Sequence, residues 1–113
     1  MRPQAFVGRG LLLAALMFLS AAAAFAPSAI SGVVRDTSGA VLTGVTVEAS
    51  SPALIEKTRT AVADSGGLFT IVDLRPGTYT VTFSLAGFNT LRREGIELPS
   101  NFTATINADL RVG

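Results

Sequence analysis

The sequence predicts an all-β fold, a seven-stranded antiparallel β-sandwich in which two sheets pack face to face. Short segments alternate apolar with polar residues, most clearly at residues 78–85, where apolar and hydroxyl side chains alternate without exception. Such alternation places one face in a core and the other in water, because side chains of a strand repeat every two residues. Glycine, proline and aspartate separate these segments, and no window shows the apolar period of a helix.

The first strand is expected at residues 29–36, where it ends in a turn capped by Asp36 and containing Gly39 with a positive φ. A second turn at residues 43–44 leads into an alternating strand at 45–50. Residues 51–57 contain Pro52 and two charges, so they are expected to form a connection.

A strand at residues 58–63 is expected to form a hairpin with a strand at 68–73, through a four-residue loop that contains two glycines. The sequence Leu-Arg-Pro-Gly at residues 74–77 then suits a type II turn, with a positive φ at Gly77.

The strand at 78–85 places Tyr79 in the core, and a bend follows at residues 87–88. Residues 89–98 are less regular and are expected to form a sheet edge, while residues 102–112 alternate again, which assigns Phe102 to the core.

Residues 1–24 have the layout of a secretory signal peptide, with Arg2 and Arg9 followed by an apolar run and four alanines. Cleavage is expected after Ala24; cleavage after Ala26 also fits the small-residue pattern but leaves Pro27 at the new N-terminus. The alternative is an uncleaved membrane anchor, but the apolar run 10–26 is at the short limit of the ~17–25 residues that span a bilayer. We therefore expect export and one domain at residues 29–113.

The composition excludes several classes of function. The chain contains no cysteine, which rules out disulfides and a lipoprotein attachment site. Beyond residue 24, acidic residues outnumber basic residues by one, a balance that does not favour a nucleic-acid partner.

A specific order of turn and strand signals runs along the chain: Ser31-Gly32-Val33-Val34 with Asp36 and Gly39, then Gly44-Val45-Thr46-Val47, residues 64–71 and 74–81, and Gly87-Phe88. This order resembles that of the carboxypeptidase regulatory-like domain, a transthyretin-like sandwich. The tail at 104–113 is similar to the version found at the N-terminus of TonB-dependent outer-membrane receptors of the Oar type. In those receptors the domain follows the signal peptide and precedes the plug and barrel.

The resemblance implies a periplasmic, outer-membrane-associated or secreted protein. Its partner would be another protein or a downstream plug and barrel, and it would meet a membrane only through a receptor or an uncleaved signal. The chain stops where the plug would begin, so both a stand-alone module and the leading part of a receptor fit the sequence.

No enzyme, cofactor or metal site is expected. Zinc carboxypeptidase chemistry needs histidine ligands, and the chain has no histidine. Ser38 and Ser65 adjoin turn glycines but lack a base that would activate them, and Glu94 and Glu97 suit a solvated edge better than a glycosidase pair.

Two binding functions remain. The first is a non-catalytic protein-interaction or spacer domain, which could work by strand addition at an exposed edge. The alternative is a carbohydrate-binding module, which would need exposed, coplanar aromatic side chains. The candidate contact residues are Phe88, beside a glycine bend, and the adjacent pair Arg92 and Arg93.

Overall fold

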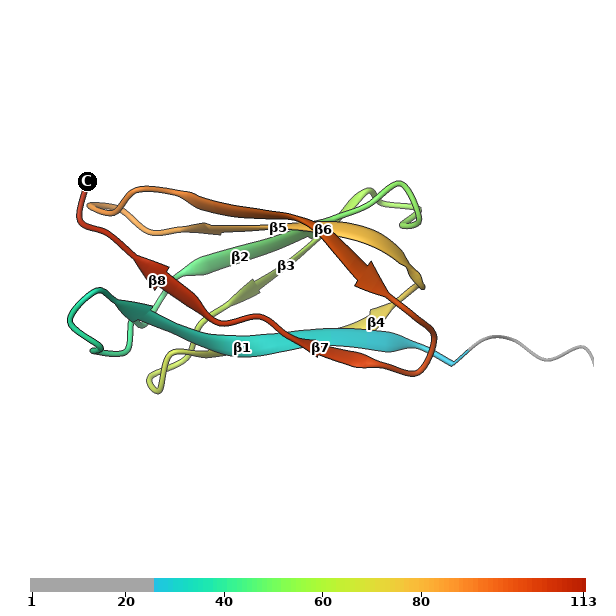
Figure 1. The fold of residues 1–113 in the computed structure, drawn as a ribbon, viewed down its shortest axis with the longest axis horizontal. Coiled ribbons are helices and arrows are strands. Elements are labelled where there is room, and N and C mark those ends of the chain that lie inside the picture. The colour runs from blue at the N-terminus through green and yellow to red at the C-terminus, as the bar shows by residue number, and fades with distance from the viewer. Residues whose placement is uncertain (1–25) are drawn as a thin grey trace, which may run out of the picture.

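The computed structural model describes residues 26–113, so the predicted signal peptide lies outside the described residues. Eight strands make up the fold (Figure 1): β1 (Ser28–Asp36), β2 (Thr46–Ser50), β3 (Thr58–Val62), β4 (Leu68–Leu74), β5 (Gly77–Ser84), β6 (Leu91–Leu98), β7 (Thr103–Thr105) and β8 (Ala108–Leu110). In the described part of the chain, no helix is long and apolar enough to cross a membrane.

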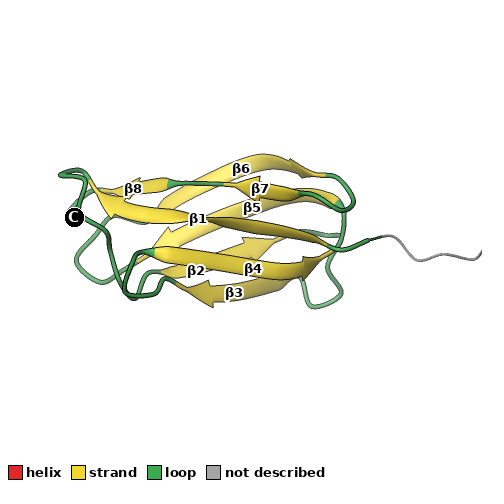
Figure 2. Ribbon diagram, turned by 90° about the horizontal axis from the view of Figure 1, so that it is seen from below, coloured by secondary structure: helices red, strands yellow, loops and turns green. Residues whose placement is uncertain are grey.

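The strands form two packed sheets, which confirms the predicted β-sandwich. One sheet has the order β4-β1-β7, with β8 also paired to β1, and the other has the order β3-β2-β5-β6. Figure 2 shows the two layers, with β3 and β4 at one side of the sandwich. The free edges of the second sheet are therefore β3 and β6.

The core lies between the sheets and follows the predicted alternation. Tyr79, Val81 and Phe83 of β5 are fully buried. Phe69 of β4 meets Phe83 edge to face across the core, with ring centroids 5.5 Å apart and planes at 75°. Such a T-shaped aromatic pair contributes roughly 0.5–1.5 kcal/mol beyond the area that it buries.

The prediction that both sheets are wholly antiparallel is wrong at β1. This strand pairs antiparallel with β4 but parallel with β7 and with β8. The single last strand predicted at 102–112 is interrupted at Ile106 and Asn107. There the Ile106 N–H donates to the Ser31 carbonyl, and the Asn107 side chain accepts from the Val33 N–H.

The predicted hairpin between residues 58–63 and 68–73 is also wrong. β3 pairs with β2, whereas β4 pairs with β1, so the turn at 64–67 carries the chain from one sheet to the other. Within this turn, Asp64 Oδ1 accepts from the Gly66 and Leu68 N–H groups, and of the two glycines only Gly67 has a positive φ (75°). A capped tight turn thus reverses the direction of the chain, but it does not determine whether the strands on its two sides belong to the same sheet.

The turn at residues 74–77 is not the predicted type II turn. The residue with a positive φ is Asp73 (φ 57°), and Gly77 has none. Gly77 is instead required by close packing, because a Cβ at this position would lie 2.8 Å from the Ala53 Cβ. The positive φ predicted at Gly39 is confirmed (94°), and Asp36 Oδ1 caps that turn by accepting from the Ser38 and Ala40 N–H groups.

The segment predicted to be irregular is mostly the regular strand β6, at the edge where it was expected. Its pairing with β5 shifts between Tyr79 and Val81, and Gly95 has φ 72°. This bulge and the charged Arg92 and Glu94 blunt the edge against pairing with another chain.

Candidate functional site

A groove of about 490 Å³ lies where the outer face of the β3-β2-β5-β6 sheet meets the loop at residues 51–57. Strands β2, β3 and β5 each supply residues with hydroxyl groups, and the loop supplies a proline and a lysine. The lining residues are Ser50, Ser51, Pro52, Lys57, Thr58, Thr78 and Thr80. We call this site the hydroxyl groove.

The loop that forms one wall of the hydroxyl groove is held by its own hydrogen bonds and by a core side chain. The Ser51 N–H donates to the Lys57 carbonyl (3.0 Å), and the Lys57 N–H donates to the Leu54 carbonyl (3.3 Å). Leu54 is buried in the core. Lys57 has φ 71°, a conformation that costs a non-glycine residue roughly 1–2 kcal/mol.

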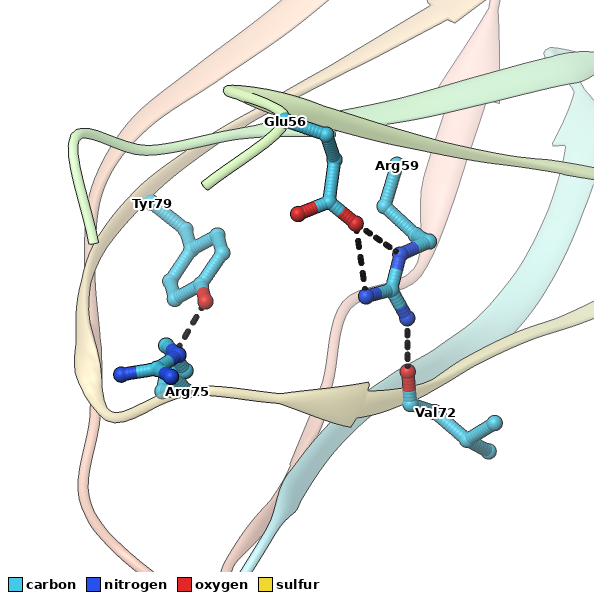
Figure 3. Close-up of polar contacts among 5 residues, drawn as sticks. All are labelled: Glu56, Arg59, Val72, Arg75 and Tyr79. Atoms are coloured by element: carbon cyan, nitrogen blue, oxygen red, sulfur yellow. Dashed lines mark hydrogen bonds and ion pairs between the residues drawn. The ribbon is translucent and has the colours of Figure 1, made fainter. Parts of the chain in front are cut away.

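Arg59 of β3 connects this loop to the opposite sheet (Figure 3). Its Nε and Nη2 donate to Glu56 Oε2 at 3.0 and 2.8 Å, and its Nη1 donates to the Val72 carbonyl of β4 at 2.8 Å. The guanidinium group therefore fixes Glu56 at the end of the loop and closes the side of the sandwich between β3 and β4.

Two pKa shifts accompany this cluster. A hydrogen bond from its own backbone N–H and the Arg59 side chain lower the pKa of Glu56. Burial raises the pKa of Tyr79, whose hydroxyl donates to the Arg75 carbonyl at 2.7 Å. Tyr79 is thus a core residue, as the sequence predicted, and its hydroxyl is hydrogen-bonded.

The exposed lining of the hydroxyl groove is mostly apolar, and its polar groups are hydroxyls and the Lys57 ammonium. Hydroxyl groups both donate and accept hydrogen bonds, and the Lys57 ammonium adds three donors and a positive charge. Thr78 Oγ1 already donates to Glu97 Oε1 (2.9 Å) at the edge of the groove. Within residues 26–113, no three His, Cys, Asp or Glu side chains are placed to hold a metal ion.

The three contact residues predicted from the sequence lie elsewhere. Phe88 is half-buried against the core, and its backbone bridges Val112. Arg92 is exposed on β6 and pairs with Glu94 at 3.1 Å. Arg93, also exposed, is the neighbour of Val81 in the β5–β6 register. None of the three lines the hydroxyl groove.

Phe102 was predicted to be a core residue, and that prediction is wrong. The residue is 48% exposed and helps to line a hollow of about 230 Å³, together with Val72 of β4 and with Pro27, which precedes β1. The preceding Asn101 has φ 55°, so β7 begins only at Thr103. Asn101 beside Ser100 is a turn signal that could have indicated this boundary.

Comparison with known proteins decides the family. The sequence model of the carboxypeptidase regulatory-like domain matches residues 29–111. The chain belongs to this family. It is also 35% identical over 102 residues to the TonB-dependent transporter Oar of Myxococcus xanthus, a match that spans 89% of this chain and 10% of Oar. The chain therefore corresponds to about a tenth of that relative.

Solved structures share the fold at low sequence identity. The Bacillus anthracis TIE protein matches 77% of this chain and 17% of its own, with a TM-score of 0.62 and 17% identity. A type II cohesin-X-dockerin complex from Acetivibrio cellulolyticus matches 76% of this chain and 58% of that one (TM-score 0.59, 24% identity). Catechol 1,2-dioxygenase of Acinetobacter radioresistens matches 79% of this chain and 53% of its own (TM-score 0.60, 13% identity). Proteins with such different names show that the likeness concerns the fold alone.

Proposed function

We propose that this carboxypeptidase regulatory-like domain is an exported, non-catalytic module of the cell envelope that spaces and connects, as the N-terminal part of a TonB-dependent receptor. The relation to Oar supports the location, because the matching region is a small part of a much larger transporter. Residues 1–24 would direct export and be removed, leaving the domain at residues 29–113.

The observation that carries the spacing role is the placement of the two ends of the described domain. Ala26 lies beside residues 100–101, where its carbonyl accepts from the Asn101 N–H and the Ser100 hydroxyl. Gly113 lies beside the turn after β5, where its N–H donates to the Gly87 carbonyl. These places are at opposite ends of the sandwich (Figure 1). Segments joined to these two ends would therefore be held apart by the full length of the domain.

Export is tested by the mature N-terminus of the native product in separated cell fractions. We expect an envelope product that begins at residue 25, or at residue 27 if cleavage follows Ala26. A cytoplasmic product that retains Met1 would contradict the proposal. An envelope product that retains Met1 would support the location but replace cleavage by a membrane anchor.

Carbohydrate binding is the second candidate, and the hydroxyl groove is the observation that favours it. The groove presents Ser50, Thr58, Thr78 and Thr80 beside Lys57. Aromatic stacking does not favour sugar binding, because it needs several exposed aromatic rings. Among the described residues, Phe102 is exposed and Phe88 is half-buried. Calorimetric titration with oligosaccharides tests it: saturable binding that Thr80→Val removes and Phe88→Ala leaves intact would place the sugar in the groove. Heats indistinguishable from buffer dilution would reject it.

A further inference from the structure

The first and last strands of the domain lie side by side and run in the same direction. β1 pairs parallel with β7 from Ala29↔Thr103 to Ser31↔Thr105, and with β8 from Val34↔Ala108 to Asp36↔Leu110. The N-terminal end of β1 and the C-terminal end of β8 are therefore at opposite ends of one continuous seam. We call the pairing of β1 with β7 and β8 the terminal seam.

Hydrogen bonds continue along the terminal seam through the break between β7 and β8. The Ala29 N–H donates to the Phe102 carbonyl (3.0 Å) before the first paired residues of β7, and the Ile106 N–H donates to the Ser31 carbonyl (2.8 Å) after the last. At the break, Asn107 Oδ1 accepts from the Val33 N–H (3.0 Å), so a side chain supplies the acceptor where the strand is interrupted.

This geometry determines how a pull on the two ends would act. Tension applied at Ala26 and at Val112 loads the bonds that join residues 111–112 to residues 88–89, and it also pulls β1 and β8 in opposite directions along the seam. The hydrogen bonds of the seam run across that direction, so all of them carry the load at the same time when the strands are pulled past each other. When strands are instead peeled apart from one end, their hydrogen bonds break one after another. Unfolding under force is governed by the unfolding rate, which falls when many bonds must break in the same step.

The core adds resistance to sliding of β1. Ile30 and Val34 are fully buried and point from β1 into the core, and Ala108 and Leu110 of β8 are buried next to them. On its other side β1 is paired with β4, with Ile30 opposite Ile71. A shift of β1 along its axis would therefore disrupt both of its neighbours and its buried side chains at once.

We propose that the terminal seam is a shear clamp that keeps this domain folded when tension is applied between its two ends. A load of this kind in the cell rests on the proposed function, in which the domain connects other segments of an envelope protein. The mechanical property belongs to the fold itself and can be measured on the purified chain.

Single-molecule pulling tests the clamp, and the absence of native cysteine lets handles be attached at chosen residues. Ala26→Cys with Val112→Cys loads the seam in shear. Thr37→Cys with Arg111→Cys pulls at the end of the seam where β1 and β8 both finish, and peels the strands apart. We expect a several-fold higher unfolding force for the first pair at the same pulling rate. Equal forces for the two pairs would overturn the proposal.

A second comparison uses the bond at the break. With the handles at residues 26 and 112, Asn107→Ala should lower the unfolding force. Asn107→Asp keeps an acceptor and should restore most of that force. Val47→Ala is the control, because Val47 is a buried residue of β2 outside the seam and its truncation lowers stability without removing a seam bond. If Val47→Ala lowered the unfolding force as much as Asn107→Ala, the seam would not be the shear clamp. If Asn107→Ala fails to fold, the two pairs of handles still decide.

The two proposals can fail separately. A domain that unfolds at equal force in both geometries has no clamp, whatever its cellular location. A strong clamp in a chain found in the cytoplasm would leave the mechanical result intact and contradict the proposed function.

Discussion

The Nη1 of Arg59 lies 2.8 Å from the carbonyl oxygen of Val72, so a single side chain joins the free edges of the two sheets. At the beginning of β4, the Leu68 N–H donates to the Asp64 carboxylate, and the Leu68 carbonyl accepts from the Asp64 N–H. Three backbone groups of this edge are thus already occupied, which disfavours the addition of a partner strand to β4.

Arg59→Ala should lower the free energy of unfolding by about 1 kcal/mol, because it removes the hydrogen bond to the Val72 carbonyl, whereas the exposed ion pair with Glu56 contributes little. Urea denaturation measures the change. Arg59→Lys should recover only part of the lost stability, since the lysine ammonium lacks the planar guanidinium fork that bonds Glu56 and Val72 at the same time. An alanine variant as stable as the parent would show that the bond between the sheets contributes nothing.

Stability should fall in acid through Glu56 and Asp36. The Glu56 backbone N–H and Arg59 lower the pKa of Glu56 below its usual 4.5, and the Ser38 hydroxyl is the main group that lowers the pKa of Asp36 below its usual 3.8. A lowered pKa in the folded state gives stability that is present above the usual pKa and lost as the pH falls through the lowered value.

Urea midpoints measured between pH 7 and pH 3 test this expectation. They should be level above about pH 5 and decline below it. The double variant Glu56→Gln, Asp36→Asn should show a shallower decline. An equally steep decline in that variant would assign the acid sensitivity to other groups.

Gly32→Ala should destabilise the terminal seam. A Cβ at Gly32 would overlap the carbonyl oxygen of Ile106, which the break between β7 and β8 brings over β1. Overpacking of this kind costs about 1–3 kcal/mol. Thermal unfolding measures it.

Gly66→Ala is the matched control for Gly32→Ala. The nearest atom to a Cβ at Gly66 is Asp64 Oδ1, at an ordinary contact distance of 3.6 Å. We expect a change within about 0.5 kcal/mol, as at most surface positions. If the two variants melted at the same temperature, the close approach at Gly32 would not matter for stability.

Truncation of Tyr79 should separate the contribution of its ring from that of its hydroxyl. The ring is fully buried, so Tyr79→Ala should cost about 3–5 kcal/mol, as for other large aromatic core residues. Tyr79→Phe should cost about 1 kcal/mol, because it removes only the bond to the Arg75 carbonyl. An alanine variant that kept its melting temperature would contradict the core assignment.

The sequence predicts the strands well because their signals are local. Alternation gave the buried face of β5, and aspartate and glycine gave the turn at residues 36–39. Which strands share a sheet is set by contacts between distant residues, and the capped turn at Asp64 looks the same whether it joins a hairpin or two sheets. The parallel pairing of β1 with β8 was missed for the same reason.

The site was less predictable than the fold. The hydroxyl groove is assembled from β2, β3, β5 and a loop, so its residues are separated in sequence and carry no motif. Phe88 was selected for its position beside a glycine; it is half-buried against the core, and its role as a contact residue stays a prediction. Phe102 was assigned inward because the alternation was extended one residue beyond the start of β7.

The connecting role is tested most directly by the intact mass of the native product that carries this domain, captured from the cell envelope of its source. An antibody against residues 58–98 captures the product without binding either end of the chain. We expect a product much larger than this chain, in which the domain precedes further receptor segments. A mass equal to residues 25–113 alone would contradict the connecting role and would indicate a free module whose ligand or partner must be sought.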